Sequence, residues 1–125
     1  MRTELLDNVN DLIQKTSNGK IRWKRINKTT FEYKKGIQIT TNESSYPRTI
    51  NTITTLQIKS GNFLMGNNTF YNFIIFDEDE KEVLVEIEAD ANEKKEYYYL
   101  LENLYKSIIN YYEERSINVF NEIIS

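Results

Sequence analysis

The fold of this chain is decided by residues 70–112, FYNFIIFDEDEKEVLVEIEADANEKKEYYYLLENLYKSIINYY. Residues 70–76 are almost continuously apolar and aromatic, which is typical of a central strand, and the acidic run at 77–80 predicts a turn. Apolar and polar residues then alternate over 83–87, which predicts the second strand of a hairpin. From about Asn92 the apolar spacing becomes helical, so antiparallel strands are followed by a helix.

The predicted C-terminal helix has an apolar arc that covers about half of its circumference. The arc continues through Val119 and Ile123 after Arg115 interrupts it, so the sequence allows either one long helix or a helix with a short terminal one. The main part of the arc consists of Tyr97, Leu100, Leu101, Leu104, Tyr105, Ile108, Tyr111 and Tyr112.

The N-terminal residues 4–17 predict a second amphipathic helix, with Thr3 as its N-cap. Gly19 follows the stop signal at 17–18 and suits a left-handed residue. The apolar residues at helical spacing are Leu5, Leu6, Val9, Leu12 and Ile13.

Between residues 21 and 39 the chain alternates, with turn signals at 27–28 and at 35–36. This pattern predicts a three-stranded antiparallel meander. Its apolar face is expected to consist of Ile21, Trp23, Phe31, Tyr33, Ile37 and Ile39. Its opposite face is expected to carry Arg22, Lys24, Lys34 and Gln38.

The segment 40–68 is less regular, because Thr, Asn and Ser dominate it and it contains Pro47, the single proline. Thr54, Leu56 and Ile58 form its best strand pattern. We interpret the segment as an insertion or an irregular edge.

A chain of 125 residues fits one domain with a real core. The order helix, strands, helix predicts a single α+β domain over 1–125. We expect an antiparallel sheet of about five to six strands, flanked on one face by an N-terminal and a long C-terminal helix.

The sequence contains no His and no Cys, the side chains most used for nucleophilic and near-neutral acid–base chemistry. The first residues are too acidic for a signal peptide, and no apolar run is long enough for a membrane span. We therefore expect a cytoplasmic protein that is not an enzyme, needs no cofactor and does not bind a membrane.

The charge is divided between the two halves of the chain. Residues 1–60 contain eleven Lys and Arg against five Asp and Glu, whereas residues 61–125 contain five against fourteen. Nearly all of the positive excess lies between 15 and 35, beside the single Trp. Such a distribution favours binding of a charged partner but does not name one.

The basic segment 20–35 is the first candidate binding site. Cations beside aromatic residues on a sheet face can hold phosphates and stack a base, which makes Arg22, Lys24 and Lys34 candidates for binding a nucleotide or a single-stranded nucleic acid. A solvated Lys-rich sheet face is the simpler interpretation, and the overall pI near 5.1 also opposes a nucleic-acid role.

The acidic residues do not predict a metal or catalytic site. The run 77–80 lacks the ligand spacing and the glycine of a calcium loop, so a charged hairpin turn explains it. Glu82, Glu86 and Glu88 have the period of the solvent face of a strand.

The tyrosine-rich helix is the second candidate binding surface. Tyrosine combines buried area with a polar tip, which suits interfaces and the borders of a core equally well. Tyr98 and Tyr99 lie at or outside the edge of the apolar arc, and Glu113 and Glu114 add acidic charge, so these four residues are the predicted interface.

Three short stretches resemble small, mostly uncharacterised bacterial and phage accessory domains: TSNGKIRW at 16–23, FIIFD at 73–77 and LENLY at 101–105. Such domains pair a helix-Gly-Lys-x-x-Trp start with a sheet and a Leu-x-x-Leu-Tyr helix. The resemblance covers residues 3–40 and 70–110. It implies an accessory binding protein and transfers no site residues.

Together these patterns predict a non-enzymatic protein-interaction domain, such as an immunity, phage-defence or counter-defence factor. Its partner is expected to be another protein or a second copy in a homodimer, and an acidic surface suits a basic partner. The alternative is nucleotide or single-stranded nucleic-acid binding through the 20–35 sheet face.

Overall fold

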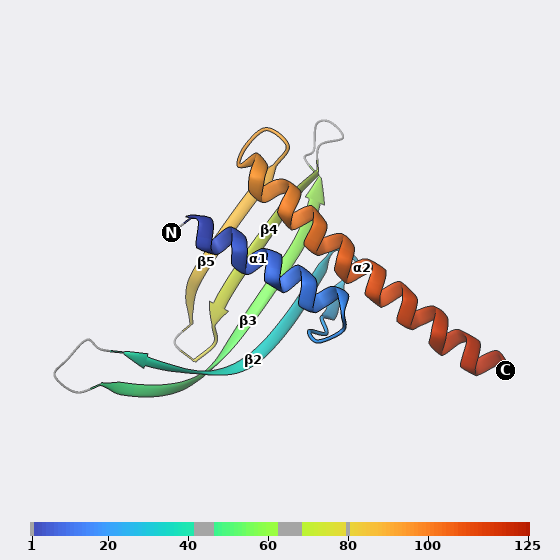
Figure 1. The fold of residues 1–125 in the computed structure, drawn as a ribbon, viewed down its shortest axis with the longest axis horizontal. Coiled ribbons are helices and arrows are strands. Elements are labelled where there is room, and N and C mark those ends of the chain that lie inside the picture. Colours follow the sequence, from blue (N-terminus) through green and yellow to red (C-terminus); the bar gives the residue numbers. More distant parts are fainter. Residues whose placement is uncertain (1, 42–46, 63–68, 80) are drawn as a thin grey trace.

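The computed structural model describes residues 2–41, 47–62, 69–79 and 81–125, and it confirms a single α+β domain (Figure 1). Its elements are α1 (Arg2–Ser17), β1 (Lys24–Asn27), β2 (Thr30–Thr41), β3 (Arg48–Asn62), β4 (Thr69–Asp77), β5 (Glu82–Asp90) and α2 (Lys95–Ile124).

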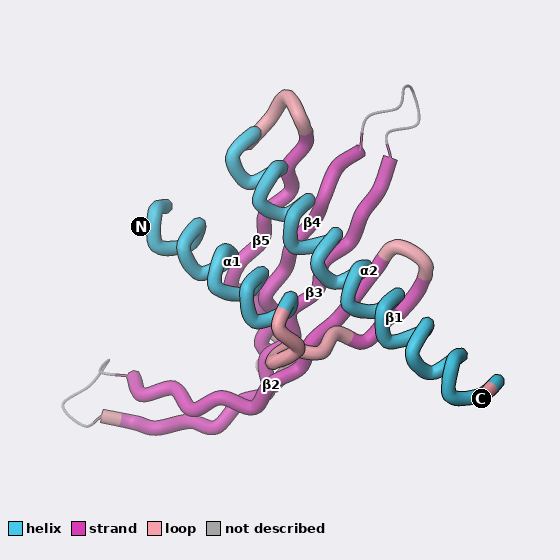
Figure 2. The backbone as a smooth tube through the Cα atoms, turned by 45° about the vertical axis from the view of Figure 1, so that its right-hand side comes forward, coloured by secondary structure: helices cyan, strands magenta, loops and turns pink. Residues whose placement is uncertain are grey.

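The strands form one open antiparallel sheet in the order β1-β2-β3-β4-β5, and both helices cover the same face of it (Figures 1 and 2). The partners Phe31, Ile58, Phe73 and Ile87 form a row across β2 to β5 on that face, and none of them is more than 5% exposed. Because alternate residues of a strand point to opposite faces, the helices bury one set of side chains and leave the other set uncovered.

A buried hydrogen-bond chain fastens α1 to the chain that enters the sheet. Trp23 Nε1 donates to Thr16 Oγ1 at 3.0 Å, and Thr16 Oγ1 donates to the Leu12 carbonyl oxygen at 2.8 Å. The buried position expected for Trp23 is confirmed, since its side chain is 7% exposed. The helix begins at Arg2, so Thr3 lies in the first turn and the prediction of an N-cap there is wrong.

Gly19 adopts the left-handed conformation that the sequence predicts, with φ of 80°. The backbone here passes close to α2, because a Cβ atom on this residue would lie 3.2 Å from the Tyr111 ring. The turn after α1 therefore needs glycine for two reasons, conformation and space.

The prediction of a turn at 35–36 is wrong. The chain runs straight through this point as one twelve-residue strand, β2, with Lys35 paired to Thr54 and Gly36 paired to Ile53. Gly36 is not among the described glycines with positive φ, so here it is an ordinary strand residue. The first predicted strand starts too early, because β1 begins at Lys24 and both Ile21 and Trp23 precede it; the second predicted strand is the start of β2, and the third is the continuation of β2.

Residues 48–62 form β3, the middle strand of the five, although we predicted an insertion or irregular edge over 40–68. β-branched Thr and Ile residues favour a strand here, and the polar composition misled the sequence interpretation. Residues 36–41 and 48–53 extend past the end of β4 as a two-stranded arm (Figure 1). The remaining parts of the segment, 42–46 and 63–68, lie outside the described residues.

The C-terminal helix is one continuous element of 30 residues, which decides between the two alternatives that the sequence allowed. Leu101, Leu104 and Ile108 are its buried residues. Beyond Tyr112 the helix continues past the sheet into solvent (Figure 1). We call residues 112–124 the projecting segment.

Candidate functional site

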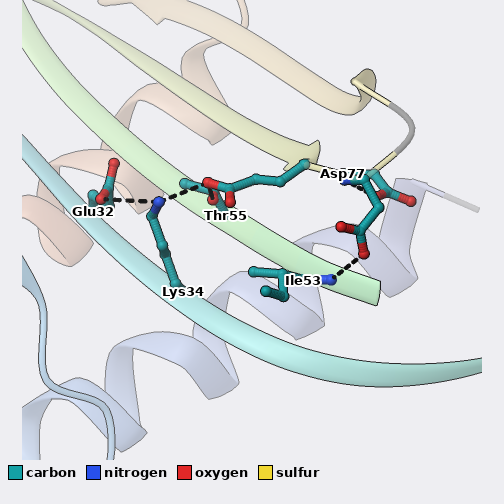
Figure 3. Close-up of polar contacts among 7 residues, drawn as sticks. Glu32, Lys34, Ile53, Thr55 and Asp77 are labelled. Carbon is teal, nitrogen blue, oxygen red and sulfur yellow. Dashed lines mark hydrogen bonds and ion pairs between the residues drawn. The ribbon is translucent and has the colours of Figure 1, made fainter. Parts of the chain in front are cut away.

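Lys34, one of the three predicted phosphate ligands, is held by carboxylates on the uncovered face of the sheet (Figure 3). Its Nζ lies 2.7 Å from Glu78 Oε1 and 4.0 Å from Glu32 Oε1. Thr55 Oγ1 donates a second hydrogen bond to Glu78 Oε1 at 2.6 Å. The hydrogen bond to Glu78 raises the pKa of Lys34, and the bonds from Lys34 and Thr55 lower the pKa of Glu78.

The structure does not gather the three basic residues into a cluster of free cations. Lys24 is on β1, directly opposite Glu32 of β2, whereas Arg22 precedes β1 and is exposed. Neighbouring carboxylates therefore reduce the positive potential of this face. Nucleotide or single-strand binding by Arg22, Lys24 and Lys34 stays a prediction.

The acidic turn after β4 fixes the position at which the β2–β3 arm leaves the sheet. Asp77 Oδ1 accepts hydrogen bonds from Thr52 Oγ1 at 2.6 Å and from the Asp79 amide at 3.0 Å. Asp79 Oδ2 accepts from the Ile53 amide at 3.1 Å (Figure 3), and the Glu78 amide donates to the Ile53 carbonyl at 3.0 Å. Within the ranges that the structure describes, no group of His, Cys, Asp and Glu has the arrangement of a metal site. Glu80, the last residue of the predicted turn, lies outside those ranges.

The two tyrosines of the predicted interface have different environments. Tyr98 is half-buried, with its ring 5.6 Å from Tyr71 and 5.3 Å from Tyr99. Burial, followed by a hydrogen bond to Glu102, raises the pKa of Tyr98. Tyr99 is 52% exposed. Tyr98 therefore borders the core, and Tyr99 belongs to the surface.

Glu113 and Glu114 are exposed at the start of the projecting segment. They follow Tyr99 by 14 and 15 residues, which at 1.5 Å per residue is about 20 Å along the helix. The four residues predicted as one interface thus form two separate areas of surface.

The projecting segment exposes apolar side chains that the sequence interpretation assigned to the continuation of the packed arc. Val119 is 52% exposed and Ile123 is 74% exposed. The other exposed large side chains on it are Tyr112, Ile117, Phe120 and Ile124. The interruption at Arg115 is the signal in the sequence that the arc changes its role there.

Two shallow hollows on the projecting segment contain both Val119 and Ile123. One is lined by Tyr112, Arg115, Ser116, Val119, Phe120 and Ile123. The other is lined by Arg115, Asn118, Val119, Glu122 and Ile123. Arg115 and Glu122 thus lie on one side of the row formed by Val119 and Ile123.

A third hollow, of about 640 Å³, lies where α1, β5 and the start of α2 meet. Leu5, Leu6, Ile87 and Tyr97 form its apolar part. Glu86, Lys94, Lys95 and Glu96 supply charges of both signs. This mixed lining does not indicate one class of ligand.

No protein-family model, no curated protein and no solved structure matches this chain. No helix in the part of the chain that the structure describes is long and apolar enough to cross a membrane.

Proposed function

We propose that this protein is a non-enzymatic protein-interaction domain and that the projecting segment is its main binding surface. The observation that carries the proposal is the exposure of five large apolar side chains on the part of α2 beyond Tyr112, where the helix has left the sheet. Contiguous exposed apolar surface is rare on soluble monomers and usually marks a contact with another molecule.

The cost of keeping this segment helical supports the same proposal. It contains Asn118, Asn121 and several β-branched residues, which are weak helix formers. A helix of this length that is not packed against anything is marginal in water. A binding partner would supply the packing that the sheet does not.

The acidic residues of this region suggest a second feature of the interaction. Glu113 and Glu114 lie beside the apolar residues and would attract a basic protein surface by charge complementarity. Together with the resemblance noted in the sequence, this favours a cytoplasmic accessory factor of immunity, phage defence or counter-defence.

Affinity capture from the native host tests the proposal. Phe120→Asp with Ile123→Asp places two charges on the apolar face without touching the core, and we expect the partners captured by the wild-type protein to be lost. Glu113→Lys with Glu114→Lys should weaken capture of a basic partner. Glu82→Lys with Glu88→Lys makes the same charge change on β5 and should leave capture unchanged.

Two results would contradict this function. The first is an unchanged set of partners for the variant Phe120→Asp/Ile123→Asp, with its circular dichroism spectrum intact. The second is tight, salt-sensitive binding of a single-stranded oligonucleotide that is lost on changing Arg22, Lys24 and Lys34, since each phosphate contact releases counterions.

A further inference from the structure

We infer that the occupant of the apolar face is the projecting segment of a second copy of this chain, packed antiparallel to the first. This inference rests on the proposed function and names the partner of that same surface. Three features of the segment carry it: the spacing of its apolar residues, the placement of its charges and the area that it exposes.

The first feature is a coiled-coil seam. Tyr112, Ser116, Val119 and Ile123 follow one another at intervals of four, three and four residues, the spacing that keeps side chains on one line between two helices. Ser116 does not prevent burial of this line, because its Oγ donates to the Tyr112 carbonyl oxygen at 2.8 Å.

The same spacing begins inside the domain. Leu101, Tyr105, Ile108 and Tyr112 also follow at four, three and four residues, and there the row packs against the sheet, with the Tyr105 ring 5.7 Å and the Tyr112 ring 6.2 Å from that of Phe31. The sheet thus covers the inner part of the row. A second helix would cover the outer part in the same way.

The second feature is a self-complementary pair of charges. Arg115 and Glu122 are seven residues apart, so they lie on the same side of the seam, as the hollow that they share with Val119 and Ile123 shows. In an antiparallel pair with its two-fold axis near Asn118, Arg115 of each copy faces Glu122 of the other. The identical surface patches of a two-fold dimer would then form two opposite-charge contacts.

A parallel pair does not have this property. Its flanking contacts join residues about five positions apart, which would bring Arg115 next to Phe120 of the other copy instead of a carboxylate. The charge placement therefore favours the antiparallel orientation.

The third feature is area. At roughly 100 Å² of exposed surface for each of the four side chains on or beside the seam, Tyr112, Val119, Phe120 and Ile123, two copies would withdraw on the order of 800 Å² from water before Arg115 and Glu122 are added, which is the size of a weak, concentration-dependent interface. A membrane surface fits less well, because amphipathic helices that bind anionic lipids are rich in Lys and Arg. The projecting segment has only Arg115 against Glu113, Glu114 and Glu122.

Sedimentation velocity over a concentration series of the full chain is the primary measurement. We expect a concentration-dependent dimer of the wild-type protein, and at least a tenfold higher dissociation constant for Phe120→Asp/Ile123→Asp. Asn121→Arg changes the side of the helix away from the seam and should leave the dissociation constant within about twofold.

Charge exchange tests the orientation. Arg115→Glu alone and Glu122→Arg alone should each weaken the dimer, because two like-charge contacts replace two opposite-charge contacts. The double variant Arg115→Glu/Glu122→Arg should recover the wild-type dissociation constant. A mixture of the two single variants should form a heterodimer, in which both contacts again have opposite charges.

Each alternative outcome overturns the inference. If the wild-type protein is monomeric at all concentrations, the occupant of the apolar face is not a second copy. If the dissociation constant of the dimer is the same in all the charge-exchange variants, the two helices do not pair antiparallel through Arg115 and Glu122. Flotation of the wild-type protein with phosphatidylcholine–phosphatidylglycerol vesicles, lost in Phe120→Asp/Ile123→Asp, would assign the face to lipid. A wild-type monomer whose host partner is still lost in Phe120→Asp/Ile123→Asp contradicts this inference but leaves the proposed function standing.

Discussion

The two parts of α2 share one helix and one apolar spacing but differ in what covers them. In the packed part, residues 95–111, Leu101 and Leu104 have no exposed surface. In the projecting segment, Phe120 is 61% exposed and Ile123 is 74% exposed. Periodicity thus specifies which side of a helix is apolar, whereas the neighbouring elements decide whether that side is buried.

The end of the sheet marks the boundary between the two parts. α2 crosses the strands from β5 toward β2 and meets Phe31 of β2 through the ring of Tyr112 (Figure 1). The remaining strand, β1, has only four residues, and all of them are exposed. The helix therefore extends beyond the surface on which it packs.

Hydrogen exchange should give the largest contrast between the two parts. Local opening costs range from near zero to the full stability of the domain, so below the dimer dissociation constant we expect amides at 101–108 to be protected about a thousandfold more than those at 116–122. The contrast should shrink at concentrations where the dimer forms. Equal protection at all concentrations would mean that the projecting segment is stable without a partner.

Truncating one apolar side chain in each part of α2 should lower the free energy of unfolding by very different amounts. Leu104→Ala leaves a cavity in the core and should lower the free energy of unfolding by about 2–5 kcal/mol. Ile123→Ala, measured by urea denaturation under monomeric conditions, should change it by less than about 0.5 kcal/mol. Similar losses for both variants would show that the domain itself covers Ile123.

The contact at the boundary between the two parts can be tested at Gly19. An alanine there must adopt positive φ and would crowd Tyr111, so we expect Gly19→Ala to lower the free energy of unfolding by about 1–2 kcal/mol. Gly36→Ala is the matched control, because its Cβ would meet nothing within 4 Å and should stabilise by about 0.5 kcal/mol. If Gly19→Ala leaves the free energy of unfolding unchanged, the turn after α1 does not lie in close contact with Tyr111 of α2.

The pH dependence should appear only in alkaline solution. Burial, with a further contribution from Glu102, raises the pKa of Tyr71 to about 12. Because the folded pKa lies above the unfolded value near 10, this contribution to stability is complete below pH 10 and is lost as the pH rises toward 12. Absorbance at 295 nm should show a late-titrating phase, to which Tyr98 and Tyr105 also contribute because burial raises their pKa, and Tyr71→Phe should reduce the amplitude of this phase by one tyrosine. An unchanged late amplitude in this variant would assign the shift to the other tyrosines.

The sequence predicted well where periodicity was strong and local. Both helices, the β4–β5 hairpin and the α+β class follow from side-chain spacing, and the left-handed Gly19 follows from its place after a helix. It failed where composition replaced periodicity. Gly36 suggested a turn, and the polar residues of 40–68 hid the middle strand, because pairing with strands on both sides stabilises β3 more than its own composition indicates.

The candidate sites were predictable only as residue types. The sequence marked Lys34 as a surface cation, but its two carboxylate neighbours come from Glu32 on the same strand and from Glu78, which lies 44 residues away in the chain. No local sequence pattern predicts the ion pair between Lys34 and Glu78. Tyr98 and Tyr99 are likewise neighbours in the sequence of the same helix. Only the position of Tyr71 decides that the side chain of Tyr98 is covered and that of Tyr99 is exposed.

The sequence by itself determined the two helices, the β4–β5 hairpin, the apolar side of each helix and the division of charge, because these depend on side-chain chemistry at fixed local spacing. Only the tertiary structure decided which charges neutralise one another and at which residue of α2 the sheet stops covering the apolar row. Both depend on distances between elements that the chain order does not contain. The exposed end of that row, from Tyr112 to Ile123, is consequently a property of the fold and not of the helix.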